Sequence, residues 1–200
     1  MEILNQLDRD CQKMADAVKG WLPEITLDRY CSFLDRMYHY TLKSGERLKW
    51  VSERASDPTL QSVFLQLSKE EVFHYKLAES DLISFGLKPR EHTPQLVIDF
   101  HKMWLSVQPQ KSNFWCGSMY VLENVGQHLA PEARSSLQRL GLKPNQARFV
   151  LAHLEEDVTH GDRLSQLCRT YADCDPEAML LGAHVSAEFW IALHREALMG

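Results

Sequence analysis

Residues 153–160 combine histidine and carboxylate side chains at helical spacing. The sequence HLEEDVTH places His153, Asp157 and His160 four and then three residues apart. Side chains at this spacing leave one face of a helix, where they can converge. Imidazole and carboxylate groups are ligands of iron and manganese. The stripe therefore indicates a metal site, although an exposed acidic helix face would have the same pattern.

A second pair of ligand types occurs earlier in the chain. Glu71 and His74 stand three residues apart in EEVFH, on the face of the predicted helix that also carries its apolar residues. A buried carboxylate and a buried imidazole are costly unless they are paired, and a divalent metal ion would pair with both. Glu-x-x-His is a ligand unit of carboxylate-bridged di-iron bundles, but on its own it is also common on surface helices.

Glu123 is the third candidate, because it stands alone in an apolar segment. Between Asp99 and Glu132 it is the only acidic residue. It can be a buried acid satisfied by the backbone or an arginine, or a bridging carboxylate from a third helix. Three carboxylates and three histidines approach the number of ligands that two ferrous or manganous ions need. We therefore predict iron, with manganese as the alternative, at Glu71, His74, Glu123, His153, Asp157 and His160.

Helices must position these residues, because strand signals are nearly absent from the sequence. Helical periodicity and Pro or Gly punctuation predict helices at residues 3–19, 27–54, 58–85, 94–107, 112–129, 131–140, 144–171 and 176–198. Asp57, Thr93 and Asp175 each precede a proline, as N-cap residues do. The prediction is a single all-α domain over residues 1–200, with seven or eight helices.

Length, charge and cysteine usage narrow the class of protein. The chain has 200 residues, is 44% hydrophobic and carries a net charge of −5, which is typical of one soluble domain. No apolar run approaches the roughly 18 residues of a membrane-spanning helix. The negative charge argues against a nucleic-acid-binding surface. An odd number of cysteines without Cys-x-x-Cys, and an N-terminus unlike a signal peptide, predict a cytoplasmic protein.

Residues beside the predicted metal helices are candidates for a substrate pocket. Tyr38 and His39 lie in the middle of the predicted helix 27–54, and Met119 and Tyr120 lie just before the isolated glutamate. Side chains of these types more often belong to a core than to a ligand site. In the last helix, we expect His194 to be structural or exposed. The sequence nominates no catalytic residue beyond the metal ligands.

The order of these motifs resembles the heme-oxygenase-like di-metal oxidases and oxygenases, also called iron-containing redox enzymes, which are relatives of the TenA/PqqC proteins. The resemblance rests on SKEEVFH at 68–74, SDLISFG at 80–86, a later glutamate and the final His-x-x-x-Asp-x-x-His, over about residues 30–170. It implies a seven-helix heme-oxygenase-like (TenA/PqqC-like) bundle. It also implies a non-heme di-iron cofactor that activates O₂ on a small substrate, often bearing an amine or a carboxylate. Many members have a glutamate where this chain has Leu67, so Glu71 would serve instead.

The sequence leaves alternatives open. The TenA branch of this fold resembles thiaminases with a cysteine nucleophile, for which Cys116 and Cys168 are candidates without a helpful local motif. A ferritin-like di-iron bundle would use Asp35 or Glu46 as a further carboxylate, but it gives His153 no role. A non-catalytic binding protein with a vestigial metal site is the third alternative. The substrate, the oxidase or oxygenase outcome and the formation of a homodimer are not specified by the sequence.

Overall fold

A computed structural model describes residues 2–200, apart from the side chains of residues 156–159. The described residues form helices and no strand. The α-helices are α1 (Glu2–Lys19), α2 (Leu27–Thr41), α3 (Ser44–Ser52), α4 (Pro58–Glu71), α5 (Tyr75–Ser84), α6 (Gln95–Ser106), α7 (Asn113–Arg139), α8 (Arg148–Tyr171) and α9 (Pro176–Met199). Short 3-10 helices precede three of them: η1 (Leu22–Glu24), η2 (Pro109–Lys111) and η3 (Pro144–Gln146). None of these described helices has the length and apolar character needed to cross a membrane.

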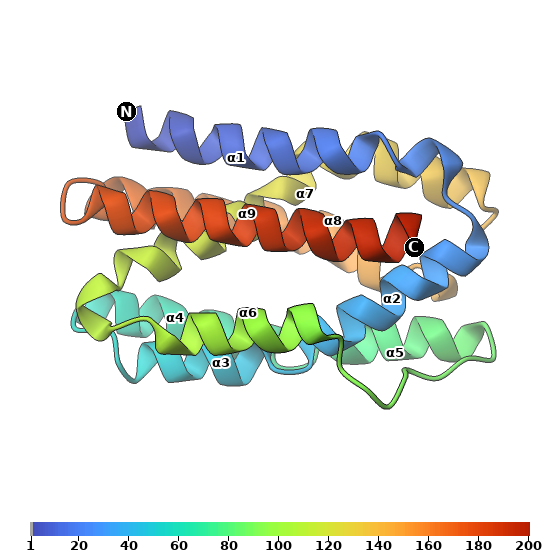
Figure 1. Ribbon diagram of the computed structural model, residues 1–200, viewed down its shortest axis with the longest axis horizontal. Helices are drawn as coiled ribbons and strands as arrows, with labels where there is room; N and C mark the ends of the chain where they lie inside the picture. The colour runs from blue at the N-terminus through green and yellow to red at the C-terminus, as the bar shows by residue number, and fades with distance from the viewer. Residues whose placement is uncertain (1) are drawn as a thin grey trace.

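The long helices α7, α8 and α9 form the centre of the bundle, and α1 packs along α7 and α9 (Figure 1). Below them in this view, α2 and α3 run antiparallel to α4 and α5, with α3 on α4 and α2 on α5. These four helices contact the central helices at two places, where α2 packs on α9 and α5 packs on α8. The helix α6 packs against α3 and α9. If α2–α3 and α4–α5 are counted as interrupted helices, the described chain is a seven-helix bundle.

Two glycines allow α7 and α9 to approach each other closely. A Cβ atom at Gly117 would lie 1.9 Å from the carbonyl oxygen of Met179, and one at Gly182 would lie 1.9 Å from that of Phe114. Any side chain at either glycine would force the two helices apart, because packed interiors have no spare volume. The contact therefore holds α7, which carries Glu123, directly against α9.

The predicted helices 27–54 and 58–85 are each interrupted, so the prediction of one continuous helix in each range is wrong. The first ends at Thr41, whose Oγ1 donates a hydrogen bond of 2.7 Å to the carbonyl group one turn earlier, an interaction that bends helices. The second ends at Glu71. There α3 packs against the chain so closely that a Cβ atom at Gly45 would lie 2.9 Å from the Cα of Val72. Glu71 thus ends α4, and His74 directly precedes α5.

Proline marks helix boundaries less strictly than the sequence predicts. The predicted helices 112–129 and 131–140 are one helix, α7, which continues through Pro131. A proline inside a helix costs about 3 kcal/mol, and the packing of α7 against α1, α8 and α9 offsets that cost. Asp57 and Asp175 do cap α4 and α9 by accepting hydrogen bonds from backbone N–H groups. Thr93 caps no helix, and its hydroxyl lies 3.3 Å from Nδ1 of His39 instead.

Candidate metal centre

Carboxylate and histidine side chains from α4, α7, α8 and the turn before α5 meet inside the bundle. One group consists of Glu71, His74 and His153, and a second consists of Glu71, Glu123 and His160. Within each group, one potential ligand atom from every residue lies within 4.8 Å of the others. Because Glu71 belongs to both groups, two adjoining positions share one carboxylate.

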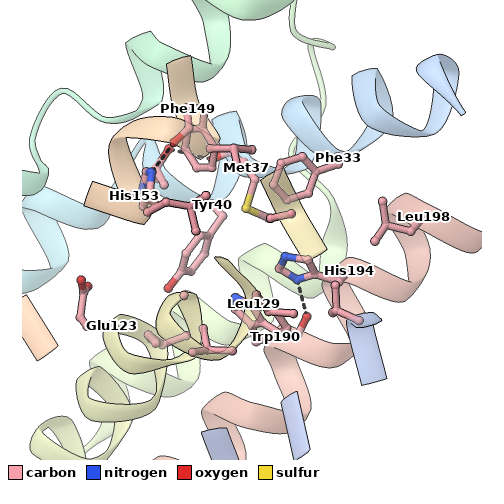
Figure 2. Close-up of a pocket in the computed structure, with 18 of the residues that line it drawn as sticks. Phe33, Met37, Tyr40, Glu123, Leu129, Phe149, His153, Trp190, His194 and Leu198 are labelled. Carbon is pink, nitrogen blue, oxygen red and sulfur yellow. Dashed lines mark hydrogen bonds between the residues drawn. The ribbon is translucent and has the colours of Figure 1, made fainter. Parts of the chain in front are cut away.

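The first group surrounds the break between α4 and α5. The buried side chains of Glu71 and His74 lie 2.9 Å apart, from Oε2 to Nδ1. His153 approaches from α8, with its ring centre 4.9 Å from that of His74. Nδ1 of His153 is 2.8 Å from the carbonyl oxygen of Phe149 (Figure 2). Since a carbonyl group can only accept, Nδ1 carries the proton and Nε2 keeps the lone pair that a metal ion requires.

The second group is centred on His160. Its Nδ1 lies 3.1 Å from Oε2 of Glu123 and 3.9 Å from Oε1 of Glu71. Its Nε2 lies 3.3 Å from Oε2 of Glu70, and the same oxygen accepts a hydrogen bond of 2.9 Å from Arg163. Metal-binding histidines commonly present their second nitrogen to a carboxylate, which orients the ring and raises its basicity. Glu70 is placed to act on His160 in this way.

The electrostatics of the cluster favour positive charge near its carboxylates. Burial raises the pKa of Glu123; the hydrogen bond from His160 opposes that rise, and the charge of Glu71 adds to it. Burial also acts to raise the pKa of Glu71, but the hydrogen bond from His74 and the histidine charges outweigh it and lower that pKa. The hydrogen bond to Glu123 is the main reason that the pKa of His160 is raised. Glu71 and Glu123 are both buried, and a cation close to both would stabilise their charged forms.

The donor set fits an iron site. Among the described residues, Glu71 and Glu123 form ion pairs only with histidine rings, so no lysine or arginine neutralises them there. Neither group of ligands contains a cysteine. Carboxylate oxygen and imidazole nitrogen without thiolate are the ligands expected for non-heme iron or manganese rather than for structural zinc.

Five of the six predicted ligands therefore come together in the structure. The side chain of the sixth, Asp157, lies outside the described residues. Its place in α8 is one turn after His153 and three residues before His160. Metal binding by all six residues stays a prediction.

An apolar cavity of about 180 Å³ adjoins these ligands. Its walls come from the ends of α1 and α4, from η1, and from α2, α3, α7, α8 and α9, and they include Glu71, Glu123 and His153. Figure 2 shows His153 and Glu123 at the same end of this space, on the left of the view, with the hydroxyl of Tyr40 directed toward Glu123. A molecule in the cavity would thus lie directly beside the candidate metal ligands.

The four predicted pocket residues are placed differently from one another. Met119 lines the cavity. Tyr120 is not among the lining residues, and its hydroxyl donates a hydrogen bond of 2.6 Å to a carboxylate of α1. Tyr38 and His39 are also outside the lining: Tyr38 packs edge-on against an aromatic ring of α5, and His39 contacts the loop before α6. The cavity-facing residue of this stretch is Tyr40, which continues the helical stripe of Phe33 and Met37.

A buried arginine lines the cavity and was not singled out from the sequence. The side chain of Arg47 is enclosed by aromatic rings, with its guanidinium 4.8 Å from the ring centre of Trp104 and 5.2 Å from that of Tyr40. Its Nη1 lies 3.0 Å from Nδ1 of His101, whose pKa is lowered to about 3 by burial and by the Arg47 charge. Within the described residues, Nε of Arg47 has no hydrogen-bond partner and no carboxylate pairs with the guanidinium. A buried cation of this kind favours an anionic ligand.

His194 also lines the cavity, and of the two expectations for it, structural or exposed, the structure contradicts exposure. Its side chain is buried in α9 and lines the cavity together with Trp190. Its four-residue spacing from Trp190 and Leu198 places all three on one face of α9, a signal that periodicity alone could have supplied.

Comparison with known proteins supports the assignment of the cluster. The profile of the iron-containing redox enzymes matches residues 31–196 of the chain. The chain belongs to this family. The matched segment includes both groups of candidate ligands and the residues Arg47 and His194.

Solved structures share the fold of this family member at low sequence identity. A domain of unknown function with a heme oxygenase-like fold from Shewanella denitrificans OS217 is 17% identical, with a TM-score of 0.78 over 98% of this chain and 88% of that chain. A TenA homologue from P. horikoshii OT3 is 12% identical, with a TM-score of 0.74 over 98% of each chain. Such likeness establishes the heme-oxygenase-like fold and favours it over the ferritin-like alternative. No curated protein matches the chain.

Proposed function

We propose that the protein is a non-heme iron oxidase or oxygenase that binds two iron ions and uses O₂ to oxidise a small organic substrate. The observation that carries this proposal is the sharing of Glu71 by two groups of ligands beside a cavity. One position would be held by Glu71, His74 and His153, and the other by Glu71, Glu123 and His160. Membership of the iron-containing redox enzymes supports iron over manganese.

Iron bound at these positions would supply the binding and reduction of O₂. The chain's own residues orient the ligands, exclude water and hold a proton. The Phe149 carbonyl fixes the ring of His153, and Glu70 fixes that of His160. The apolar walls of the cavity exclude water from the substrate side. Burial raises the pKa of Tyr40, so its hydroxyl keeps its proton and can donate a hydrogen bond toward the cluster.

Arg47 favours a substrate that carries a carboxylate. It lines the same cavity as Glu71 and Glu123, and no described carboxylate neutralises it. An anionic group of the substrate would supply the missing counter-charge and place the rest of the molecule next to the metal ligands. An amine-bearing substrate would gain nothing from this residue, because the guanidinium repels a cation.

The thiaminase-like alternative finds less support. Cys116 and Cys168 are both fully buried, and neither lines the cavity. Burial raises the pKa of Cys116 to about 12 and that of Cys168 well above its ordinary value. Thiols in this state are poor nucleophiles, because the thiolate is the reactive form.

The proposal is tested by metal analysis after anaerobic loading with Fe(II), followed by O₂ consumption with a panel of carboxylate- and amine-bearing substrates. We expect about two iron ions per chain, as in other carboxylate-bridged bundles, and faster loss of O₂ with the right substrate. His153→Ala should lower both, whereas His184→Ala, a change of an exposed histidine on α9, should lower neither. A folded protein that takes up no iron would instead be a non-catalytic binding protein.

A further inference from the structure

The cavity continues away from the metal ligands as a long apolar channel beside α7. Its lining residues on this helix recur every three or four positions from Met119 to just beyond the helix end at Leu140. At a rise of 1.5 Å per residue, the 17 steps from Glu123 to Leu140 span about 25 Å. The opposite walls are the apolar faces of α2 and α9. An occupant that touches the metal ligands and fills this channel must be elongated and mostly apolar.

Away from the metal ligands, the channel is lined by the hydroxyls of Tyr30 and Ser136, the indole of Trp190 and the imidazole of His194. The hydroxyls of Tyr30 and Ser136 are already used, because each donates to a main-chain carbonyl oxygen, at 3.1 and 3.4 Å. The imidazole of His194 is used at one nitrogen only. Its Nδ1 lies 2.8 Å from the carbonyl oxygen of Trp190 and must carry the proton. Nε2 of His194 is therefore a hydrogen-bond acceptor, and none of the described residues donates to it.

The position of His194 directs this acceptor into the channel. The side chain is 5% exposed, and its ring stacks on Trp190 with centres 3.6 Å apart. In Figure 2 the ring stands inside the cavity, with Nδ1 toward the Trp190 carbonyl and the other nitrogen toward Met37. Burial lowers the pKa of His194 to about 4, so the ring is neutral at physiological pH. Nε2 of His194 thus faces the cavity, where a ligand that donates a hydrogen bond can pair with it.

His194 is also within reach of a molecule that touches the metal ligands. Its ring centre is 5.5 Å from that of Phe33, which is 6.0 Å from that of Phe149. Phe149 in turn lies 4.2 Å from the ring of His153. These aromatic contacts form a continuous wall from the acceptor to the first metal position.

We propose that the substrate is an elongated, mostly apolar molecule with a hydroxyl group that donates a hydrogen bond to Nε2 of His194 while its reacting end lies at the metal ligands. A carboxylate has no proton to donate there, and a cation would enter an apolar channel without a counter-charge. The assignment of the reacting end rests on the proposed function. The channel and its acceptor do not depend on bound metal.

The test compares two isomers of equal size, octan-1-ol and 1-methoxyheptane, by calorimetry with metal-free and iron-loaded protein. Only the alcohol can donate a hydrogen bond. We expect the alcohol to bind about tenfold more tightly, which is the upper range for one hydrogen bond. His194→Phe should abolish this preference, whereas His184→Phe, the same change at an exposed position of α9, should retain it. Equal binding of the isomers to the wild-type protein, or absence of binding by both, would overturn the proposal.

Two further measurements test the proposal even if the phenylalanine variant does not fold. His194→Gln offers an amide oxygen as acceptor and should keep part of the preference. In the wild-type protein, the nitrogen-15 resonance of His194 Nε2 should shift on addition of the alcohol and not of the ether; an unchanged resonance with bound alcohol contradicts the proposal. Iron uptake is measured on the same samples. Preference without iron uptake refutes the proposed function alone, and iron uptake without preference refutes this inference alone.

Discussion

Oε2 of Glu71 lies 2.9 Å from Nδ1 of His74, although the two residues stand on opposite sides of a helix break. The other carboxylate oxygen, Oε1, lies 3.9 Å from Nδ1 of His160 on α8. One side chain at the end of α4 therefore connects the two groups of ligands. Glu71 should therefore contribute to both proposed metal positions, whereas each histidine should contribute to one.

Replacement of Glu71 should remove both metal positions, whereas replacement of a histidine should remove one. We expect Glu71→Ala to bind almost no iron, and His153→Ala or His160→Ala to retain about half of the wild-type amount. Elemental analysis after anaerobic Fe(II) loading measures this difference, with circular dichroism as the check on folding. Equal loss in the three variants would show that the positions are not joined through Glu71.

Glu70 should act on metal affinity through His160. Loss of an outer carboxylate partner typically weakens metal binding about 10- to 100-fold, and we expect a decrease of this size for Glu70→Ala. Glu70→Gln keeps an oxygen that accepts from Nε2, so its affinity should be intermediate. Competition with a chelator of known affinity gives the values. If alanine and glutamine have the same effect, the contact of 3.3 Å does not orient the ring.

Arg47 should determine the preference for carboxylates. For octanoate we expect Arg47→Gln to bind at least about tenfold more weakly than the wild type, because a hydrogen bond to a charged group is worth about 1.5–3 kcal/mol. Octan-1-ol, which lacks the charge, should bind equally well to both proteins. Calorimetry of both proteins with both ligands separates the effect of the lost charge from a collapse of the cavity. A collapse would weaken the binding of octanoate and octan-1-ol alike.

His194 should make stability fall in acid. Its pKa is lowered by burial from 6.5 to about 4 in the folded protein, so below pH 6.5 the unfolded chain binds the proton that the fold excludes. As the pH falls from 6.5 to 4, protonation of His194 in the unfolded chain lowers the free energy of unfolding by about 1.4 kcal/mol per pH unit. Urea denaturation of His194→Phe should show a shallower pH dependence than the wild type or His184→Phe. Parallel curves for all three proteins would contradict the burial of a neutral imidazole.

Asp81 should stabilise the start of α8 and thereby the position of His153. Its Oδ2 accepts a hydrogen bond of 2.9 Å from the backbone N–H of Phe149. We expect Asp81→Ala to lower stability by about 1–2 kcal/mol, as for other helix caps. Asp57→Ala, which removes the cap of α4, should cost a similar amount. Only the Asp81 variant should also bind iron more weakly, and thermal unfolding with and without Fe(II) tests this distinction.

The candidate metal ligands could be nominated from the sequence because each stands out locally, and the structure brings five of the six together. Glu123 is the only acid in a long apolar stretch, and His153 and His160 share one face of a single helix. The all-α bundle likewise follows from periodicity and from the near absence of strand signals. The breaks in two helices could not be predicted in this way. The break after Glu71 depends on the contact of Gly45 with Val72, which is visible only in the folded structure.

The cavity was harder to predict because its walls combine faces of distant helices. Arg47 lies in the polar sequence KSGERLKW and has the pattern of a surface residue. Only the packing of α6 and the rings around its guanidinium bury it. Tyr38 and Tyr40 differ by two positions, or about 200° around a helix, so the choice between them depends on the rotation of α2 in the bundle.

The backbone contact between α7 and α9 at Gly117 and Gly182 has a consequence for how the cavity of this protein can change. A side chain at either glycine would push the two helices apart and disturb the cavity walls, because its Cβ atom would lie 1.9 Å from a main-chain oxygen. The helix α2, which contains no glycine, contributes Phe33, Met37 and Tyr40 to the opposite wall. Evolution or design toward new substrates should therefore substitute these three side chains first and leave the glycine contact intact.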